Sequence, residues 1–235
     1  MAAFVFVHGS GQNAGCWSRV GDRLRAKGHT VAAPDLPKQA PEWGLEEYAA
    51  AIAESIPGPR AVVVGHSLSG VFLPLIPQAQ ECALLVFLAA VIPEPGKSVR
   101  EQFAQDPGMF SPEWIAAGAR WFDASQQESL SKEFLFHDCD EETLSWALGS
   151  VEPLNPGRLV TQPAPFARWP GVPAASIVAA HDKTLTPGWG RRASLRLLGK
   201  EAIEIQSGHC PHVSQPAMMA DLLEQLAHGS LGHDR

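Results

Sequence analysis

The sequence predicts an α/β fold: a mainly parallel central sheet of about six strands with helices on both faces. Short runs rich in Val, Ile, Phe and Ala recur along the chain and are bounded by Gly, Pro or Asp. The runs are continuously apolar, which is typical of strands buried on both faces of a parallel sheet. Helix-length segments separate most of the runs, and such alternation favours parallel pairing. A chain of 235 residues, 45% of them hydrophobic, suits one domain, or one domain with a sizeable insertion.

The elements follow in chain order. Strands are predicted at residues 3–7, 30–34, 61–65, 83–90, 175–180 and 202–206. Helices with one apolar face are predicted over residues 16–28 and 45–56, and a last helix over 216–226. Gly28 is a typical helix stop.

The alternation breaks between residues 96 and 165, where helix starts replace strands. These starts are Pro112 after a serine, a capping box from Ser125 to Glu128, and Asp140. The segment is rich in Trp and Phe, and it follows the end of a strand, where α/β sheets bind ligands. It is therefore interpreted as a helical lid. The alternative is that its aromatic rings only attach it to the core; most should do so, while two or three line a pocket.

Charge and cysteine content exclude several classes of protein. The chain has 18 basic and 25 acidic residues, a net charge of −7, and no basic run, which argues against nucleic acid or an anionic membrane as partner. Its 4 cysteines are scattered without a CxxC pair, which argues against disulfides or a zinc knuckle. No apolar run reaches the roughly 18 residues of a membrane span, and the N-terminus reads as a strand. A soluble cytoplasmic protein is expected.

The third strand runs directly into a candidate nucleophile, Ser67. The string from Gly65 to Gly70 resembles the nucleophile elbow of α/β-hydrolases, a sharp strand–turn–helix that projects a serine hydroxyl at the edge of the sheet. Small residues are needed because strand and helix cross closely around a strained serine. The usual pattern has glycine two residues after the nucleophile, whereas this chain has Ser69.

The first strand ends in a glycine-rich loop that could supply an oxyanion hole. By resemblance to the same enzymes, the donors would be the backbone amides of Ser10 and Leu68. Gly9 and Gly11 would leave the approach to these amides open. The alternative is a plain glycine-rich turn between a strand and a helix.

A serine hydroxyl needs a base, and the base needs an orienting carboxylate. Asp182 follows the fifth strand and His209 follows the sixth, so Ser67, Asp182 and His209 come in the chain order of this fold. Glu94, after the fourth strand, is the alternative carboxylate.

Two histidines stand close together near the C-terminus, His209 and His212. As a metal site they lack a third ligand at a helpful spacing, and Pro211 between them disfavours a regular helix. His209 comes first after the strand, where a base is expected, and His212 is expected to pack or to begin a helix. His8 and His66 are expected to have structural roles.

These motifs together resemble the α/β-hydrolase superfamily, and within it the compact branch of plant-type methylesterases, hydroxynitrile lyases and their bacterial relatives. The resemblance implies a hydrolase core of residues 1–95 and 166–235, a lid of residues 96–165, and no organic cofactor or metal. The lyases carry threonine and lysine where this chain has Gly9 and Cys210. That difference favours ester hydrolysis.

The expected enzyme is a serine carboxylesterase for small apolar or aromatic esters, with methyl esters suggested by the family alone. Its substrate pocket is expected to include Gly9, Trp114, Trp121, Phe122 and Trp146. Two alternatives remain open: lyase, C–C-cleaving or lactone-opening chemistry on the same triad, or a non-catalytic protein that binds a small ligand. A homodimer is compatible with the sequence.

Overall fold

The computed structural model describes residues 1–38, 40 and 42–231. Positions 39, 41 and 232–235, which belong to the predicted core, lie outside the described residues. In the described part, one sheet has the strand order β2-β1-β3-β4-β5-β6, and every neighbouring pair is parallel. The strands are β1 Ala3–Val7, β2 Thr30–Ala32, β3 Ala61–His66, β4 Cys82–Leu88, β5 Ala174–Ala179 and β6 Ile203–Ile205. All six predicted strands are confirmed, with ends that differ by one or two residues.

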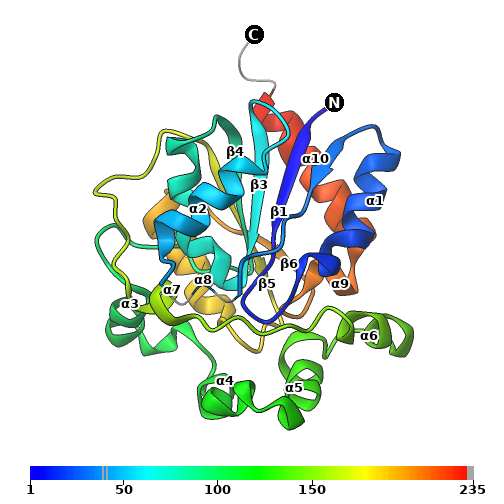
Figure 1. Cartoon of the computed structure of the whole chain (residues 1–235), viewed down its shortest axis with the longest axis vertical. Coiled ribbons are helices and arrows are strands. Elements are labelled where there is room, and N and C mark those ends of the chain that lie inside the picture. Colours follow the sequence, from blue (N-terminus) through cyan, green and yellow to red (C-terminus); the bar gives the residue numbers. More distant parts are fainter. Residues whose placement is uncertain (39, 41, 232–235) are drawn as a thin grey trace.

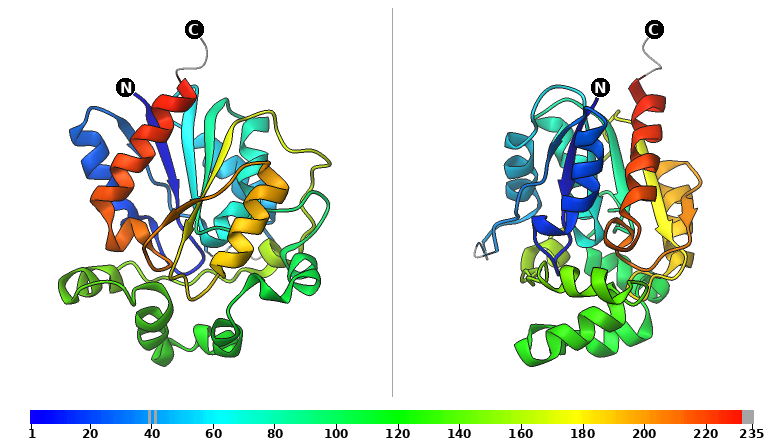
Figure 2. Two further views of the ribbon diagram at one scale, coloured as in Figure 1. Left: turned by 180° about the vertical axis from the view of Figure 1, so that it is seen from behind. Right: turned by 90° about the vertical axis from the view of Figure 1, so that its right-hand side faces the viewer.

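Helices cover both faces of the sheet, as predicted (Figures 1 and 2). The α-helices are α1 Ser18–Ala26, α2 Leu45–Glu54, α3 Val99–Gln105, α4 Pro112–Ala117, α5 Ala124–Leu130, α6 Glu141–Leu148, α7 Gly157–Thr161, α8 Pro187–Ala193, α9 Pro211–Ser214 and α10 Pro216–Leu231. In β1, Phe4 and Phe6 pack toward α1 and α10, whereas Val5 and Val7 pack toward α2 and α8. All four are fully buried. Because helices cover both faces of β1, its sequence is continuously apolar.

The helix predicted after the third strand is present, as a 3-10 helix rather than a regular α-helix. Residues Ser67–Gln78 form a 3-10 helix that contains Pro74 and Pro77. Because proline has no amide hydrogen and its ring clashes with the preceding turn, these two residues disfavour a regular α-helix. The segment still packs against α2 and β4 in the apolar core.

The described part of residues 96–165 follows β4 and precedes β5 in the chain, and it holds helices α3 to α7 and no strand. It lies at one end of the molecule (Figure 1). Phe134 and Phe136 are buried in the same apolar cluster as α1 and α10, so aromatic rings attach the segment to the core. The predicted capping box at Ser125 is wrong. Asp123, two residues earlier, caps α5 by accepting the Ser125 amide.

The capping box lies instead at the start of α3. There the Ser98 hydroxyl accepts the Glu101 amide, and the Glu101 carboxylate accepts the Ser98 amide. Among the residues described, no helix is both long and apolar enough to cross a membrane.

Candidate active site

Ser67 lies in a sharp turn where β3 ends and the 3-10 helix begins. Its φ angle is 57°, in the left-handed region that non-glycine residues rarely adopt. Two glycines permit this turn. A Cβ at Gly65 would lie 2.7 Å from the Leu73 side chain, and a Cβ at Gly70 would lie 2.2 Å from the Val91 carbonyl oxygen. The turn therefore has the strained, tightly crossed backbone expected for a nucleophile.

Ser69 fits this turn without displacing it. The residue is buried, and its hydroxyl lies 2.8 Å from the carbonyl oxygen of His66 and 3.2 Å from that of Val7. Gly70, not residue 69, makes the closest backbone approach. A serine is therefore accommodated where the family pattern has glycine.

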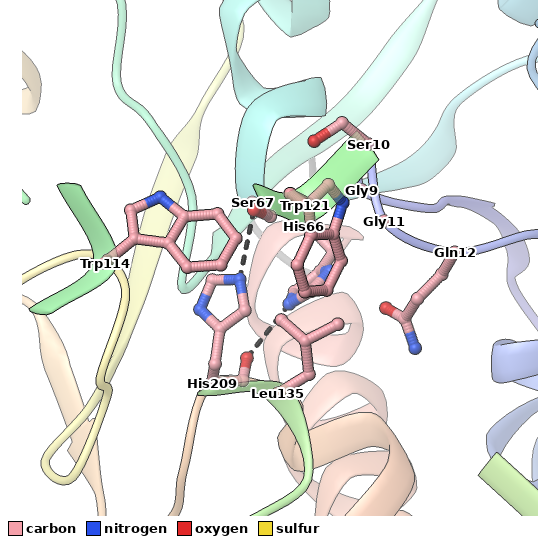
Figure 3. Close-up of a pocket in the computed structure, with 10 residues that line it drawn as sticks. All are labelled: Gly9, Ser10, Gly11, Gln12, His66, Ser67, Trp114, Trp121, Leu135 and His209. Carbon is pink, nitrogen blue, oxygen red and sulfur yellow. Dashed lines mark hydrogen bonds between the residues drawn. The ribbon is translucent and has the colours of Figure 1, made fainter. Parts of the chain in front are cut away.

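The three residues predicted as a triad lie in hydrogen-bonding contact, and Figure 3 shows the bond between His209 and Ser67. His209 Nε2 is 3.0 Å from Ser67 Oγ, and His209 Nδ1 is 2.7 Å from Asp182 Oδ2. Because an ionised carboxylate only accepts, the proton of the neutral imidazole lies on Nδ1. Nε2 is then free to accept the hydroxyl proton of Ser67, which is the geometry of a general base beside a nucleophile.

The second oxygen of Asp182 is held by its own loop. Asp182 Oδ1 accepts hydrogen bonds from the Thr184 amide at 2.7 Å, the Thr184 hydroxyl at 2.9 Å and the Leu185 amide at 3.1 Å. The side chains of Asp182 and His209 are each 2% exposed. These donors fix the carboxylate so that its other oxygen faces His209.

The loop after β1 lies directly against Ser67. A Cβ at Gly9 would be 2.8 Å from the Ser67 Cβ, so only glycine permits this approach. The Ser10 amide has no hydrogen-bond acceptor within the described part of the chain. Leu68 is the second residue of the 3-10 helix, and its amide has no partner inside that helix. Both amides are thus available to bind an anion, as predicted for an oxyanion hole, although that role stays a prediction.

A small pocket lies beside the Ser67 hydroxyl (Figure 3). It is lined by Gly9, Ser10, Gly11, Gln12, His66, Ser67, Trp114, Trp121, Leu135 and His209. Of the predicted pocket residues, Gly9, Trp114 and Trp121 are among them. Trp146 is placed elsewhere, because its ring lies 4.2 Å from the Arg19 guanidinium on α1. The side chain of Phe122 lies outside the described residues.

Four lining residues were not predicted to belong to the pocket: Gly11, Gln12, His66 and Leu135. Gly11 and Gln12 belong to the same loop as Ser10, so the prediction of an oxyanion-hole loop could have identified them as pocket residues. Leu135 comes from a π-helical turn, Ser131–Leu135, and its sequence context gives no comparable signal.

The neighbouring histidines have structural contacts. His66 Nε2 donates to the carbonyl oxygen of His209 at 2.9 Å, which ties the nucleophile turn to the loop of the base. His8 donates through Nδ1 to the Gly9 carbonyl oxygen and accepts the Leu36 amide through Nε2. Burial lowers the pKa of both histidines, so both are neutral at neutral pH.

His212 lies away from the hydroxyl and packs instead. It is fully buried, its ring stacks on Trp17 with the centroids 4.2 Å apart, and burial lowers its pKa to about 3. His209 contacts both Ser67 and Asp182, so its two nitrogens are occupied, which leaves none for a metal shared with His212.

Among the residues that the structure describes, one other group has metal-ligating composition, and it includes the lining residue His66. Ligand atoms of His66, Cys210 and His212 are within 4.8 Å of one another. His66 Nε2 already donates to the His209 carbonyl, and burial raises the pKa of the Cys210 thiol well above its usual range. The contacts are those of neutral, packed side chains.

The alternative carboxylate, Glu94, is engaged in ion pairs. Its side chain pairs with Lys97 and with Arg196, the latter at 2.7 Å. Asp182, not Glu94, contacts the histidine.

Comparisons with known proteins agree with the fold. Residues 4–222 match a family model described as "Alpha/beta hydrolase family". "Probable esterase PIR7A" of Oryza sativa subsp. indica is 47% identical over 107 residues, so the match spans 40% of this chain and 41% of that protein. "Methylesterase 2" of Arabidopsis thaliana is 27% identical over 256 residues, covering 95% of each. The crystal structure of polyneuridine aldehyde esterase has a TM-score of 0.75 at 22% identity, covering 97% of this chain and 99% of that one.

Proposed function

This chain belongs to the alpha/beta hydrolase family, and we propose that it hydrolyses carboxylic esters through a triad of Ser67, His209 and Asp182. The observation that carries the proposal is the continuous line of contacts from the Ser67 hydroxyl through both nitrogens of His209 to Asp182. Relatives with esterase and methylesterase names support the same reaction class.

The proposed reaction has two halves. Ser67 Oγ attacks the ester carbonyl carbon while His209 Nε2 takes the hydroxyl proton, and Asp182 stabilises the resulting imidazolium. The amides of Ser10 and Leu68 bind the oxyanion; one such donor is worth about a hundred- to thousandfold in rate in other enzymes. His209 then gives its proton to the leaving alcohol, which leaves an acyl group on Ser67. Water, deprotonated by His209, attacks this acyl group; the bond to Ser67 Oγ breaks, His209 returns the proton to that oxygen, and the acid is released.

The pocket favours an ester with a small apolar or aromatic group. Trp114, Trp121 and Leu135 form an apolar wall, and the lining residues include no Lys or Arg. Residues 96–165 would act as the lid over a core of residues 1–95 and 166–235. A methyl ester is suggested by the name of the Arabidopsis relative.

The residue that follows His209 makes cyanide chemistry the weaker alternative. Cys210 stands beside His209 where the lyases have lysine, and its buried thiol is neutral because burial raises its pKa. It offers no positive charge for a cyanide anion. A cytoplasmic location stays a prediction, supported by the free state of all 4 cysteines.

Labelling with a fluorophosphonate probe tests the nucleophile. Wild type should form a covalent adduct and Ser67→Ala should form none, at matched thermal stability. Release of acid from aryl and methyl esters, measured beside cyanide release from mandelonitrile, tests the reaction class. No adduct on folded wild type, or cyanide release without ester turnover, would contradict the proposal.

A further inference from the structure

Two adjacent side chains of the insertion, His137 and Asp138, contact the loops that carry the base and its carboxylate. Asp138 Oδ2 accepts the backbone amide of Gly208 at 2.7 Å, and Gly208 directly precedes His209. His137 Nε2 donates to the carbonyl oxygen of His181 at 3.0 Å, and His181 directly precedes Asp182. Each member of the pair thus holds the residue that directly precedes one member of the triad.

Asp138 also holds the far end of the segment around His209. The same oxygen, Oδ2, accepts the hydroxyl of Ser214 at 2.9 Å and lies 3.3 Å from the hydroxyl of Ser207. Hydrogen bonds to an ionised carboxylate are stronger than those between neutral groups. One carboxylate oxygen therefore fixes the chain on both sides of His209.

Gly208 is shaped for this contact. A Cβ there would lie 2.7 Å from Asp138 Oδ1 and 2.8 Å from His137 Nε2. Real Cβ atoms do not approach so closely, so any other residue would push both side chains away. The glycine before His209 and the His–Asp pair of the insertion are matched to each other.

The residues that precede the pair in the chain anchor it in the core. Phe134 and Phe136, just before it in the chain, are 2% and 1% exposed and pack in the apolar cluster with α1 and α10. The turn is closed by the Cys139 amide, which donates to the carbonyl oxygen of Phe136 at 3.0 Å. These contacts therefore fix His137 and Asp138, and through them the two loops, relative to the core. The pair of His137 and Asp138 is called the latch below.

We propose that His137 and Asp138 are positioning residues that keep His209 in line between Asp182 and Ser67. The inference rests on the proposed function and assigns these residues no contact with substrate, since neither lines the pocket beside Ser67. Their loss should let the two loops shift, and a misplacement of about 1 Å can cost roughly a hundredfold in rate. The effect should fall on kcat, because the pocket walls stay in place.

Asp138→Ala, compared with Asp138→Asn and Asp140→Ala, tests the proposal. Asp140 is a matched control: it stands two residues away and caps α6 through the Thr143 amide at 2.8 Å. Asp138→Ala should lower kcat by about ten- to a hundredfold with KM within about twofold. Asp138→Asn should recover most of the loss, because an amide oxygen can accept the same donors. Asp140→Ala should keep the kcat of wild type.

Hydrogen–deuterium exchange gives a readout that does not depend on esterase activity. Peptides covering residues 207–214 should exchange faster in Asp138→Ala and unchanged in Asp140→Ala. Unchanged exchange, a loss confined to KM, or an equal loss of kcat in the asparagine and alanine variants would overturn the latch. Wild type that is inactive on every ester would instead contradict the proposed function, and exchange would still decide the latch.

Discussion

Replacing Ser69 tests how the nucleophile turn tolerates its unusual serine. The buried hydroxyl donates to the His66 carbonyl oxygen at 2.8 Å, and such a bond contributes about 1 kcal/mol net. Ser69→Ala removes the bond alone. Ser69→Gly, which restores the common family pattern, also adds about 0.5–1 kcal/mol of backbone entropy cost. The free energy of unfolding should therefore fall by about 1 kcal/mol for alanine and about 1.5–2 kcal/mol for glycine.

For a chain of 235 residues, 1 kcal/mol shifts Tm by about 2–4 °C, so calorimetry should resolve the two variants from wild type. The kcat for an aryl ester should stay within about twofold, because Gly65, Gly70 and the Val91 amide hold Ser67 without help from residue 69. A glycine variant that melts higher than wild type, or that turns over ester tenfold faster, would refute the reasoning and show that Ser69 strains the turn.

Three further predictions follow from the site. His209→Ala should lose at least about a thousandfold in kcat, whereas His212→Ala should stay within about tenfold; steady-state ester hydrolysis compares them, and the reverse order would assign the base to His212. Burial lowers the pKa of His212 to about 3 in the folded chain, whereas the unfolded chain binds its proton below about pH 6.5; His212 alone should therefore lower the free energy of unfolding by about 2 kcal/mol from pH 7 to pH 5, in addition to the fall caused by His8 and His66, and denaturant titration of His212→Met should show a smaller fall than wild type. Trp114→Ala should raise KM for aromatic esters several-fold more than for acetate esters, and equal changes would remove Trp114 from the binding wall.

The strands and the order of the site residues could be predicted because both depend on local pattern and on parallel topology. Each strand lies between two layers of helices, so consecutive residues point to opposite faces that are both buried, and the strand sequence is continuously apolar. Parallel strands end at one edge of the sheet, so residues that follow β3, β5 and β6 meet although Ser67 and His209 are 142 positions apart.

Side-chain directions in the insertion could not be predicted in the same way. Trp121 and Trp146 both lie in short helices of the insertion, yet one lines the pocket and the other lies under Arg19, because the packing of these helices decides which way each ring turns. The latch formed by His137 and Asp138 depends on contacts 44 and 70 residues apart in sequence. No local periodicity reports such contacts.

The insertion leaves the sheet at Leu88 and returns at Ala174, and the two strands that it joins, β4 and β5, are neighbours. The ends of this long loop are thus held together by strand pairing whatever its length. Doubling a flexible loop costs only about 0.6 kcal/mol of closure entropy. Closure entropy therefore sets little limit on the length of the insertion. An exchanged insertion has instead to replace the core contacts of Phe134 and Phe136, and one that does so but lacks a His–Asp pair opposite Gly208 should fold and still be slow.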